Sequence, residues 1–178
     1  VYLGPEFSPL EIRTALDAAQ LQYQELTNGR MELRLAELLH EGFIIARFQG
    51  RMEFGPRALG NRSILYHTQD PAANDWLNHQ LRRSEFMPFA PVTLMEHAHN
   101  CYNNVSGAEH AAEFMTITFD ATPTMQAQSP ACVHVDGTAR PQLIRRQVNP
   151  SIYDTLTHYH RLSGIPSLIN TSFNMHEE

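Results

Sequence analysis

The chain has 178 residues, of which 42% are hydrophobic and 18% are charged, with a formal net charge of −6. This length and hydrophobic share suit a single globular domain with a buried core, and the acidic balance argues against nucleic-acid binding, which needs a basic excess. No apolar run approaches the roughly 20 residues that a membrane-spanning helix requires. Two cysteines and the lack of a charged-then-apolar leader predict a cytoplasmic protein without disulfides.

All thirteen basic residues are arginine, and the sequence contains no lysine. This composition excludes a lysine Schiff base and a Gly-Lys phosphate loop, because both need an ammonium group. A side chain that holds an anion must therefore be a guanidinium or a charged histidine. The guanidinium is planar, permanently charged and able to bind two oxygens at once.

The first helix should begin at Ser8, because Ser8, Pro9 and Glu11 combine an N-cap, a proline at the first helical position and the glutamate of a capping box. A second helix is predicted over residues 31–41, followed by Gly42 as a left-handed C-cap.

The next segments alternate strands with a helix. Branched and aromatic residues predict a buried strand over residues 43–48, and a further strand is expected over 63–66. The third helix is predicted over residues 70–82. Its inward side chains should be Trp76, Leu77 and Leu81.

The second half of the chain continues this alternation. Residues 88–95 predict a strand at a sheet edge or with a bulge, because two prolines interrupt its start. Further strands are expected over residues 114–119, 132–136, 143–145 and from 167 onward, with residues 122–130 as a mobile surface loop. The last helix should cover residues 150–162, capped by Asn149 and stopped by Gly164. Together these elements predict a single α/β domain with a mixed sheet.

The first segment with potential chemistry is the loop of residues 55–63. Gly55 and Gly60 let the backbone turn tightly and bring N–H groups close to a ligand, while Arg57 and Arg62 supply charge. The alternative is a glycine-rich connector with solvated arginines, since short patterns of this kind often match by chance.

Two further segments carry arginines. Arg82 and Arg83 complement the dipole of a helix end, or project into a cleft if the following segment lines one. Asp136-Gly137 is best interpreted as a turn signal. Arg140 follows that turn. Because a turn needs no arginine, Arg140 is the stronger candidate for a binding residue in this segment.

The fourth segment is the polar end of the last strand. Because side chains alternate along a strand, Asn170, Ser172 and Asn174 should share one face. Strand ends of this kind bind ligands in open α/β sheets, whereas the alternative is a solvated edge. The four segments together favour a pocket for a phosphorylated or carboxylated small molecule.

The histidines and cysteines indicate no metal centre and no covalent nucleophile. The i, i+2 pairs are best interpreted as surface histidines because no cysteine or carboxylate cluster accompanies them. These pairs are His97/His99 and His158/His160. No nucleophile elbow is present, and neither cysteine has a neighbour that would activate it.

Four sequence blocks resemble the C-terminal domain of NodU/CmcH-type O-carbamoyltransferases. They occur in the family's order and cover most of the chain from about Phe48 onward, and Leu3-Gly4-Pro5 is similar to the family's lead-in between its two domains. The blocks are residues 50–64, 85–91, 134–140 and 170–174.

The resemblance implies a YrdC-like α/β fold, a twisted mixed sheet flanked by helices. It also implies that residues 1–178 form one domain of a longer enzyme, with residues 1–30 as the interdomain lead-in and first helix. In this family the domain binds carbamoyl phosphate and ATP and makes carbamoyl-adenylate. A separate N-terminal domain, which contains iron or another metal, passes the carbamoyl group to a hydroxyl acceptor. A non-catalytic anion-binding module that docks on a partner enzyme is the alternative.

The resemblance also implies roles for individual residues. Arg57, Arg140 and Ser172 match the catalytic positions, and the two arginines should contact carbamoyl phosphate. Ser172 and Asn174 match a substrate-binding Ser-x-Asn element, and either Arg82 or Arg83 stands in for the lysine of a Lys-x-Arg element. ATP is expected to bring Mg²⁺ on its phosphates, with Asp136 a candidate ligand. The residues expected to hold ATP are Arg62, Thr138 and Asn170.

Overall fold

The computed structural model describes residues 1–27, 29–80 and 88–173. The α-helices in these ranges are α1 (Pro9–Ala18), α2 (Arg30–His40), α3 (Ala73–Gln80), α4 (Ala98–Cys101), α5 (Glu109–Ala112), α6 (Pro123–Gln128) and α7 (Pro150–Ser163). The strands are β1 (Ile45–Phe48), β2 (Arg62–Tyr66), β3 (Pro91–Leu94), β4 (Phe119–Asp120), β5 (Thr138–Ala139), β6 (Gln142–Ile144) and β7 (Ser167–Ser172). Short 3-10 helices are η1 (Met95–His97) and η2 (Pro130–Cys132).

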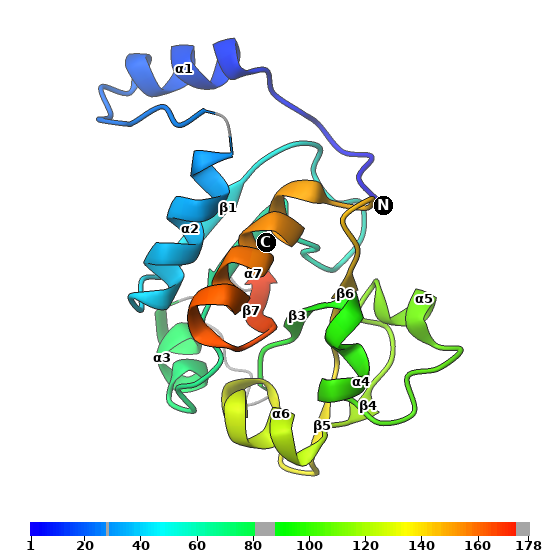
Figure 1. Ribbon diagram of the computed structural model, residues 1–178. Helices are drawn as coiled ribbons and strands as arrows, with labels where there is room; N and C mark the ends of the chain where they lie inside the picture. Colours follow the sequence, from blue (N-terminus) through cyan, green and yellow to red (C-terminus); the bar gives the residue numbers. More distant parts are fainter. Residues whose placement is uncertain (28, 81–87, 174–178) are drawn as a thin grey trace.

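The main sheet of the described chain is mixed, with the strand order β1-β2-β7-β3-β6 (Figure 1). All neighbours in it are antiparallel except β3 and β6, which run parallel. β4 and β5 form a separate two-stranded antiparallel sheet. This arrangement confirms the prediction of an α/β fold with a mixed sheet.

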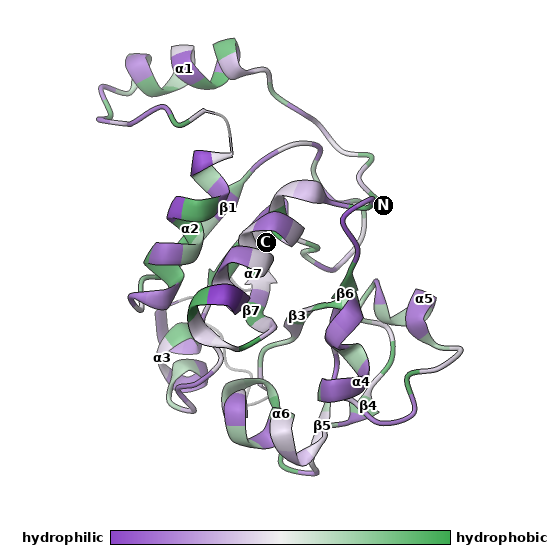
Figure 2. Ribbon diagram, in the orientation of Figure 1, coloured by the Kyte–Doolittle hydropathy of each residue, from purple (hydrophilic) through white to green (hydrophobic). Residues whose placement is uncertain are grey.

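Each face of the main sheet is covered by its own helices. One face packs Leu65, Val92 and Leu168 against α2 and α7, and the other packs Ile64 and Ile169 against α3, α4 and α6. The opposite placement of neighbouring residues in β2 and β7 follows from the two-residue period of a strand. Figure 2 shows α2 with hydrophobic and hydrophilic residues interleaved, as expected of a helix with one buried side.

The ends of two helices follow local rules that the sequence already contains. Ser8 Oγ accepts a hydrogen bond from the Glu11 N–H at 3.3 Å, and the Glu11 carboxylate accepts from the Ser8 N–H at 2.7 Å. Asn149 caps α7, and Gly164 ends it with φ at 76°. The three predicted caps, Ser8, Asn149 and Gly164, are therefore confirmed.

Helix α1 stands apart from the body of the molecule (Figure 1). None of its residues is buried. The lead-in before it is nevertheless bound to the body, because the Gly4 N–H donates to the Met52 carbonyl at 2.9 Å.

The predicted edge position of the proline-containing strand is wrong. β3 lies inside the sheet between β7 and β6. Pro91 is its first residue, opposite Ile169, a position that proline tolerates because the ladder needs no N–H from it.

The predicted loop over residues 122–130 is also wrong, because α6 forms there. Thr122 Oγ1 accepts from the Met125 N–H at 3.2 Å, Pro123 occupies the first helical position, and Met125 is 2% exposed. Thr122 and Pro123 are a helix-start signal. Burial of Met125 stabilises this helix, although most of its residues are polar.

Three other expectations differ from the structure. Residues 132–136 are not a strand, because Gly137 at φ 81° and a hydrogen bond from the His134 N–H to the Thr138 carbonyl (2.7 Å) close a tight turn. The strand predicted over 114–119 is reduced to β4. Trp76 is 46% exposed and does not point inward. Its ring stacks on that of Tyr66, with the ring centroids 6.5 Å apart. Leu81 lies outside the described residues.

No helix within the described ranges is long and apolar enough to cross a bilayer.

Candidate functional site

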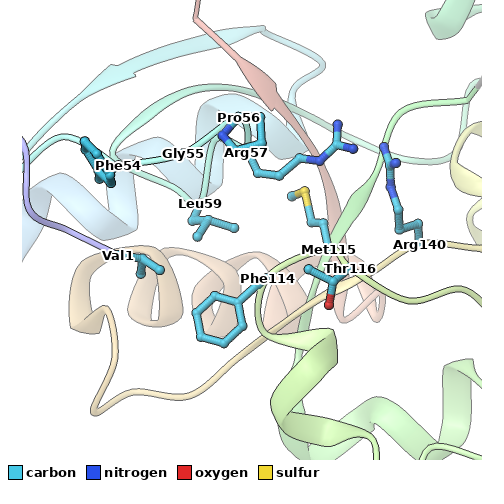
Figure 3. Close-up of a pocket in the computed structure, with 10 residues that line it drawn as sticks. All are labelled: Val1, Phe54, Gly55, Pro56, Arg57, Leu59, Phe114, Met115, Thr116 and Arg140. Carbon is cyan, nitrogen blue, oxygen red and sulfur yellow. The ribbon is translucent and has the colours of Figure 1, made fainter.

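A pocket of about 410 Å³ opens where the lead-in, the glycine-arginine loop, residues 114–116 and Arg140, which lies between β5 and β6, meet. Figure 3 shows its lining, which combines two arginines with a larger apolar wall. The lining residues are Val1, Phe54, Gly55, Pro56, Arg57, Leu59, Phe114, Met115, Thr116 and Arg140.

Arg57 and Arg140 extend toward each other from opposite sides of this pocket (Figure 3). Among the described residues, no hydrogen bond or ion pair joins another side chain to the exposed Arg57 guanidinium. Two guanidinium groups on one pocket can each bind oxygens of the same anion. The geometry is therefore suited to a small anion.

A buried carboxylate shapes the loop that carries Arg57. Glu53 is 7% exposed, and its side chain accepts hydrogen bonds from three backbone N–H groups. These belong to Leu59 (2.7 Å), Asn61 (2.8 Å) and Arg62 (3.1 Å). Because a carboxylate can accept several hydrogen bonds at once, one side chain fixes the direction of this whole backbone stretch.

A buried arginine holds the same stretch from its carbonyl side. Arg47 is 4% exposed, and its Nε donates to the Gly60 carbonyl. Burial lowers the pKa of Arg47 to about 10, so the group remains charged at neutral pH. Gly60 has φ at 109°, and a Cβ there would lie 2.7 Å from Ile152 Cδ1. Only glycine fits at this point between the loop and α7.

Two buried amides tie the loop to the sheet. Asn170 of β7 donates through Nδ2 to the Ala58 carbonyl at 3.1 Å and to Gln142 Oε1 at 2.7 Å. Gln142 of β6 donates to the Leu59 carbonyl at 2.9 Å. The pocket wall is thus attached to strands β6 and β7, which are far apart in sequence.

The turn before Arg140 is held by its own hydrogen bonds. The Thr138 N–H and hydroxyl both donate to Asp136 Oδ1, at 3.0 and 2.8 Å, and these bonds lower the pKa of Asp136. His134 Nδ1 lies 2.9 Å from Thr138 Oγ1. Burial lowers the pKa of His134, the Asp136 carboxylate partly opposes this shift, and Arg140 makes a smaller contribution that lowers the pKa further. His134 is therefore neutral at pH 7, and the positive charge here comes from Arg140.

The structure places four other predicted site residues, Arg62, Thr138, Asn170 and Ser172, outside the lining of this pocket. Arg62 donates to the carbonyls of Gln49 and Gly50 at 2.8 and 3.1 Å and lies 3.7 Å above the ring of Phe48. Ser172 is opposite Ser63 in the ladder and shares the face of Asn170. Arg82, Arg83 and Asn174 lie outside the described residues.

These observations can be compared with known proteins. The family model described as Carbamoyltransferase C-terminus matches residues 36–178 of the chain. The chain belongs to this family.

Similar proteins carry the carbamoyltransferase C-terminal domain as part of a longer chain. An uncharacterized protein of Methanocaldococcus jannaschii is 37% identical over 98% of this chain and 29% of its own length. Nodulation protein NolNO of Sinorhizobium fredii is 36% identical over 100% of this chain and 26% of its own. Nodulation protein U of Rhizobium tropici is 37% identical over 81% of this chain and 24% of its own length. The chain therefore spans less than a third of each of these relatives.

The residues that sequence reasoning missed in this carbamoyltransferase domain are Glu53, Arg47 and Gln142. Glu53 had one available signal, an acidic residue inside a glycine- and arginine-rich loop. Arg47 had another, a charge in the middle of an apolar strand. Gln142 had none, because only the sheet order brings it to Leu59.

The described part of the chain holds no group of three or more side chains that could ligate a metal. His97 and His160, which belong to different predicted pairs, meet with ring centroids 4.3 Å apart. Burial raises the pKa of Cys101 to about 11 and raises that of Cys132 further, so both thiols are protonated at neutral pH. A protonated, buried thiol is a poor nucleophile.

Proposed function

We propose that this domain binds carbamoyl phosphate and ATP and forms carbamoyl-adenylate, as one half of an O-carbamoyltransferase. A carbamoyl-transferring N-terminal domain of the same longer chain would then pass the group to a hydroxyl acceptor. The observation that carries the proposal is the convergence of Arg57 and Arg140 on one pocket. Family membership supports the transferase class.

The proposed reaction breaks and forms bonds only at carbonyl carbon and phosphorus. Water converts carbamoyl phosphate into carbamate and inorganic phosphate. A carbamate oxygen then attacks the α-phosphorus of ATP and displaces pyrophosphate, which leaves carbamoyl-adenylate. Such displacements depend on positioning and on neutralisation of phosphate charge more than on a covalent nucleophile.

The chain's own residues supply these two requirements. Arg57 and Arg140 would bind the phosphate oxygens of carbamoyl phosphate, and the loss of one such contact typically costs about 3 kcal/mol of transition-state stabilisation. Ser172 lies on the same face of β7 as Asn170, which donates a hydrogen bond to the Ala58 carbonyl. The Ser172 hydroxyl would donate a further hydrogen bond to the substrate. Arg62 would act by holding residues 49–50, because its donors are directed at their carbonyls.

The described residues fit a magnesium ion carried by ATP better than one bound by protein carboxylates. Asp136, the candidate ligand, uses one carboxylate oxygen for two hydrogen bonds to Thr138. Within residues 1–27, 29–80 and 88–173, Asp136 belongs to no group of three or more side chains that could ligate a metal. When present, Mg²⁺ on the ATP phosphates would neutralise part of their charge.

Calorimetry with carbamoyl phosphate, ATP and their mixture tests the binding part of the proposal. Replacing Arg57 or Arg140 with alanine should weaken carbamoyl phosphate binding by about a hundredfold, since each loses a charge-assisted contact to phosphate. The melting temperature of Arg57→Ala should stay close to that of the unsubstituted chain, because Arg57 is exposed. Arg161→Ala, an exposed arginine near the end of α7, is the matched control and should bind normally.

Exchange of radiolabel between ATP and pyrophosphate tests the chemical part. Exchange that depends on carbamoyl phosphate supports formation of carbamoyl-adenylate. Binding without exchange, in a protein that also carries its N-terminal domain, would instead indicate a non-catalytic anion-binding module that docks on a partner enzyme. Unchanged affinity in both arginine variants would overturn the assignment of the pocket.

A further inference from the structure

The lead-in of residues 1–6 runs beside residues 52–54, directly before the Arg57 loop. Three backbone hydrogen bonds join the two segments: Gly4 N–H to Met52 O (2.9 Å), Met52 N–H to Pro5 O (3.0 Å) and Phe54 N–H to Val1 O (2.6 Å). Arg62 adds a side-chain hydrogen bond to the Pro5 carbonyl at 3.2 Å. Backbone hydrogen bonds therefore hold the lead-in against the segment that contains Glu53.

Tyr2 links this lead-in to the wall of the pocket. Its ring packs against a small apolar cluster that contains Leu59, Ala90 and Met115. Its hydroxyl donates to the Leu59 carbonyl at 2.9 Å, the same carbonyl that Gln142 binds from β6. Burial raises the pKa of Tyr2, so the phenol keeps its proton and remains a donor at neutral pH.

Gly4 shows how closely the lead-in approaches its neighbour. A Cβ at this position would lie 2.8 Å from Met52 Cβ and 2.9 Å from the Met52 carbonyl oxygen. Real Cβ atoms do not approach backbone oxygen so closely, and the obstructing atoms cannot rotate away. Any larger residue at Gly4 must therefore push residues 1–5 away from residues 52–54.

We propose that the lead-in is a structural wall of the arginine pocket, and that Tyr2 is a positioning residue that holds Leu59 and thereby orients Arg57. Val1 lines the pocket, and Tyr2 holds the backbone two residues after Arg57. The lead-in therefore connects α1 with the site itself. The identity of the ligand in this inference rests on the proposed function.

Tyr2→Phe and Gly4→Ala test the inference by two independent routes. Tyr2→Phe removes the hydroxyl and keeps the ring in its cluster, whereas Gly4→Ala keeps Tyr2 and displaces its segment. In Tyr2→Phe, the backbone amides of residues 59–62 should exchange with solvent about fivefold faster in the ligand-free chain, the change that corresponds to one net hydrogen bond. Carbamoyl phosphate affinity should fall by a similar factor.

The matched control is Leu3→Ala, which changes the residue between the two test positions. Leu3 is 68% exposed, so its loss should leave both readouts unchanged. The amides of α7 report global stability in every variant. A selective increase at residues 59–62 therefore distinguishes positioning from general destabilisation, and Tyr2→Phe keeps the test decisive if Gly4→Ala does not fold.

The two readouts separate this inference from the proposed function. If Tyr2→Phe and Gly4→Ala leave exchange at residues 59–62 as slow as in Leu3→Ala, the inference is overturned. If exchange rises but the unsubstituted chain binds no carbamoyl phosphate, the wall assignment stands and the proposed ligand is wrong. Faster exchange with unchanged carbamoyl phosphate affinity would remove the claim that Tyr2 orients Arg57.

Discussion

The loop of residues 53–62 and the layer formed by α2 and α7 meet at Gly60, yet they are held by different forces. The helix layer is stabilised by buried apolar side chains such as Leu39, Ile152 and Leu156, each 0% exposed. The loop instead depends on hydrogen bonds to Glu53 and Arg47, which are charged and almost fully buried.

Apolar burial stabilises the helix layer, whereas the hydrogen bonds of the loop fix the positions of its atoms. Apolar burial is non-directional and roughly proportional to area, so the helix layer tolerates small shifts. Hydrogen bonds to a carboxylate are directional and require matching geometry. A loop that must aim Arg57 at a small anion benefits from the second kind of restraint.

The largest expected effect comes from breaking the polar frame of the loop. Glu53→Ala leaves the N–H groups of residues 59, 61 and 62 without their acceptor and removes one of the negative charges that favour the charged form of buried Arg47. The free energy of unfolding, measured by urea titration, should fall by about 4 kcal/mol. Carbamoyl phosphate binding should be lost as well.

Glu53→Gln is the informative companion to this variant. Glutamine keeps the size and one accepting oxygen, so it should lose less stability than alanine does. If both variants unfold at the urea concentration of the unsubstituted chain, the buried carboxylate does not hold the loop.

A smaller loss is expected from the apolar layer. Leu156→Ala creates a cavity between α7 and the sheet, and the free energy of unfolding should fall by about 3 kcal/mol. Carbamoyl phosphate affinity should remain normal in the folded fraction, because Leu156 contacts neither the loop frame nor the pocket lining.

The control on the same helix is Leu162→Ala, because Leu162 is 45% exposed and its loss should be nearly neutral. A Leu156→Ala protein with strongly weakened ligand binding would show that stability and pocket geometry are not separable in this fold.

The smallest effect concerns pH and the helix layer. Burial lowers the pKa of His160, the neighbouring His97 ring lowers it further, and Glu96 partly opposes both. Because the folded pKa lies below the unfolded value of about 6.5, the unfolded chain binds more protons on acidification. Stability should therefore be complete above about pH 6.5 and decline as the pH falls below it.

Urea titrations at about pH 7.5 and about pH 5.5 measure this decline on either side of the unfolded pKa. His160→Gln should reduce the difference between the two midpoints without abolishing it. Burial also lowers the pKa values of His67 and His134, and both histidines remain in the variant. An identical difference in the variant would exclude His160 as a contributor.

Sequence reasoning predicted the elements whose signals are local. The capping box at Ser8 and Glu11 and the caps of α7 at Asn149 and Gly164 all depend on residues within one helix. It failed at α6, where it missed the local start signal of Thr122 and Pro123 and could not foresee that Met125 is buried against other segments.

The candidate site shows the same division. The sequence indicated that Arg57 and Arg140 could share an anion, and the structure places both on one pocket. Their roles in binding remain predictions. The frame that orients them could not be foreseen, because Gln142 and Asn170 reach the loop only through the strand order β7-β3-β6.

The sequence alone therefore determined the α/β class, the lysine-free chemistry of the cations and the ends of the capped helices, since each depends on composition or on neighbours along the chain. Only the tertiary structure decided that β3 lies inside the sheet and that Tyr2 touches the pocket wall. It alone also decided that Glu53 is buried beneath the loop. These features require contacts between residues far apart in sequence, and such contacts form only when the whole sheet is assembled.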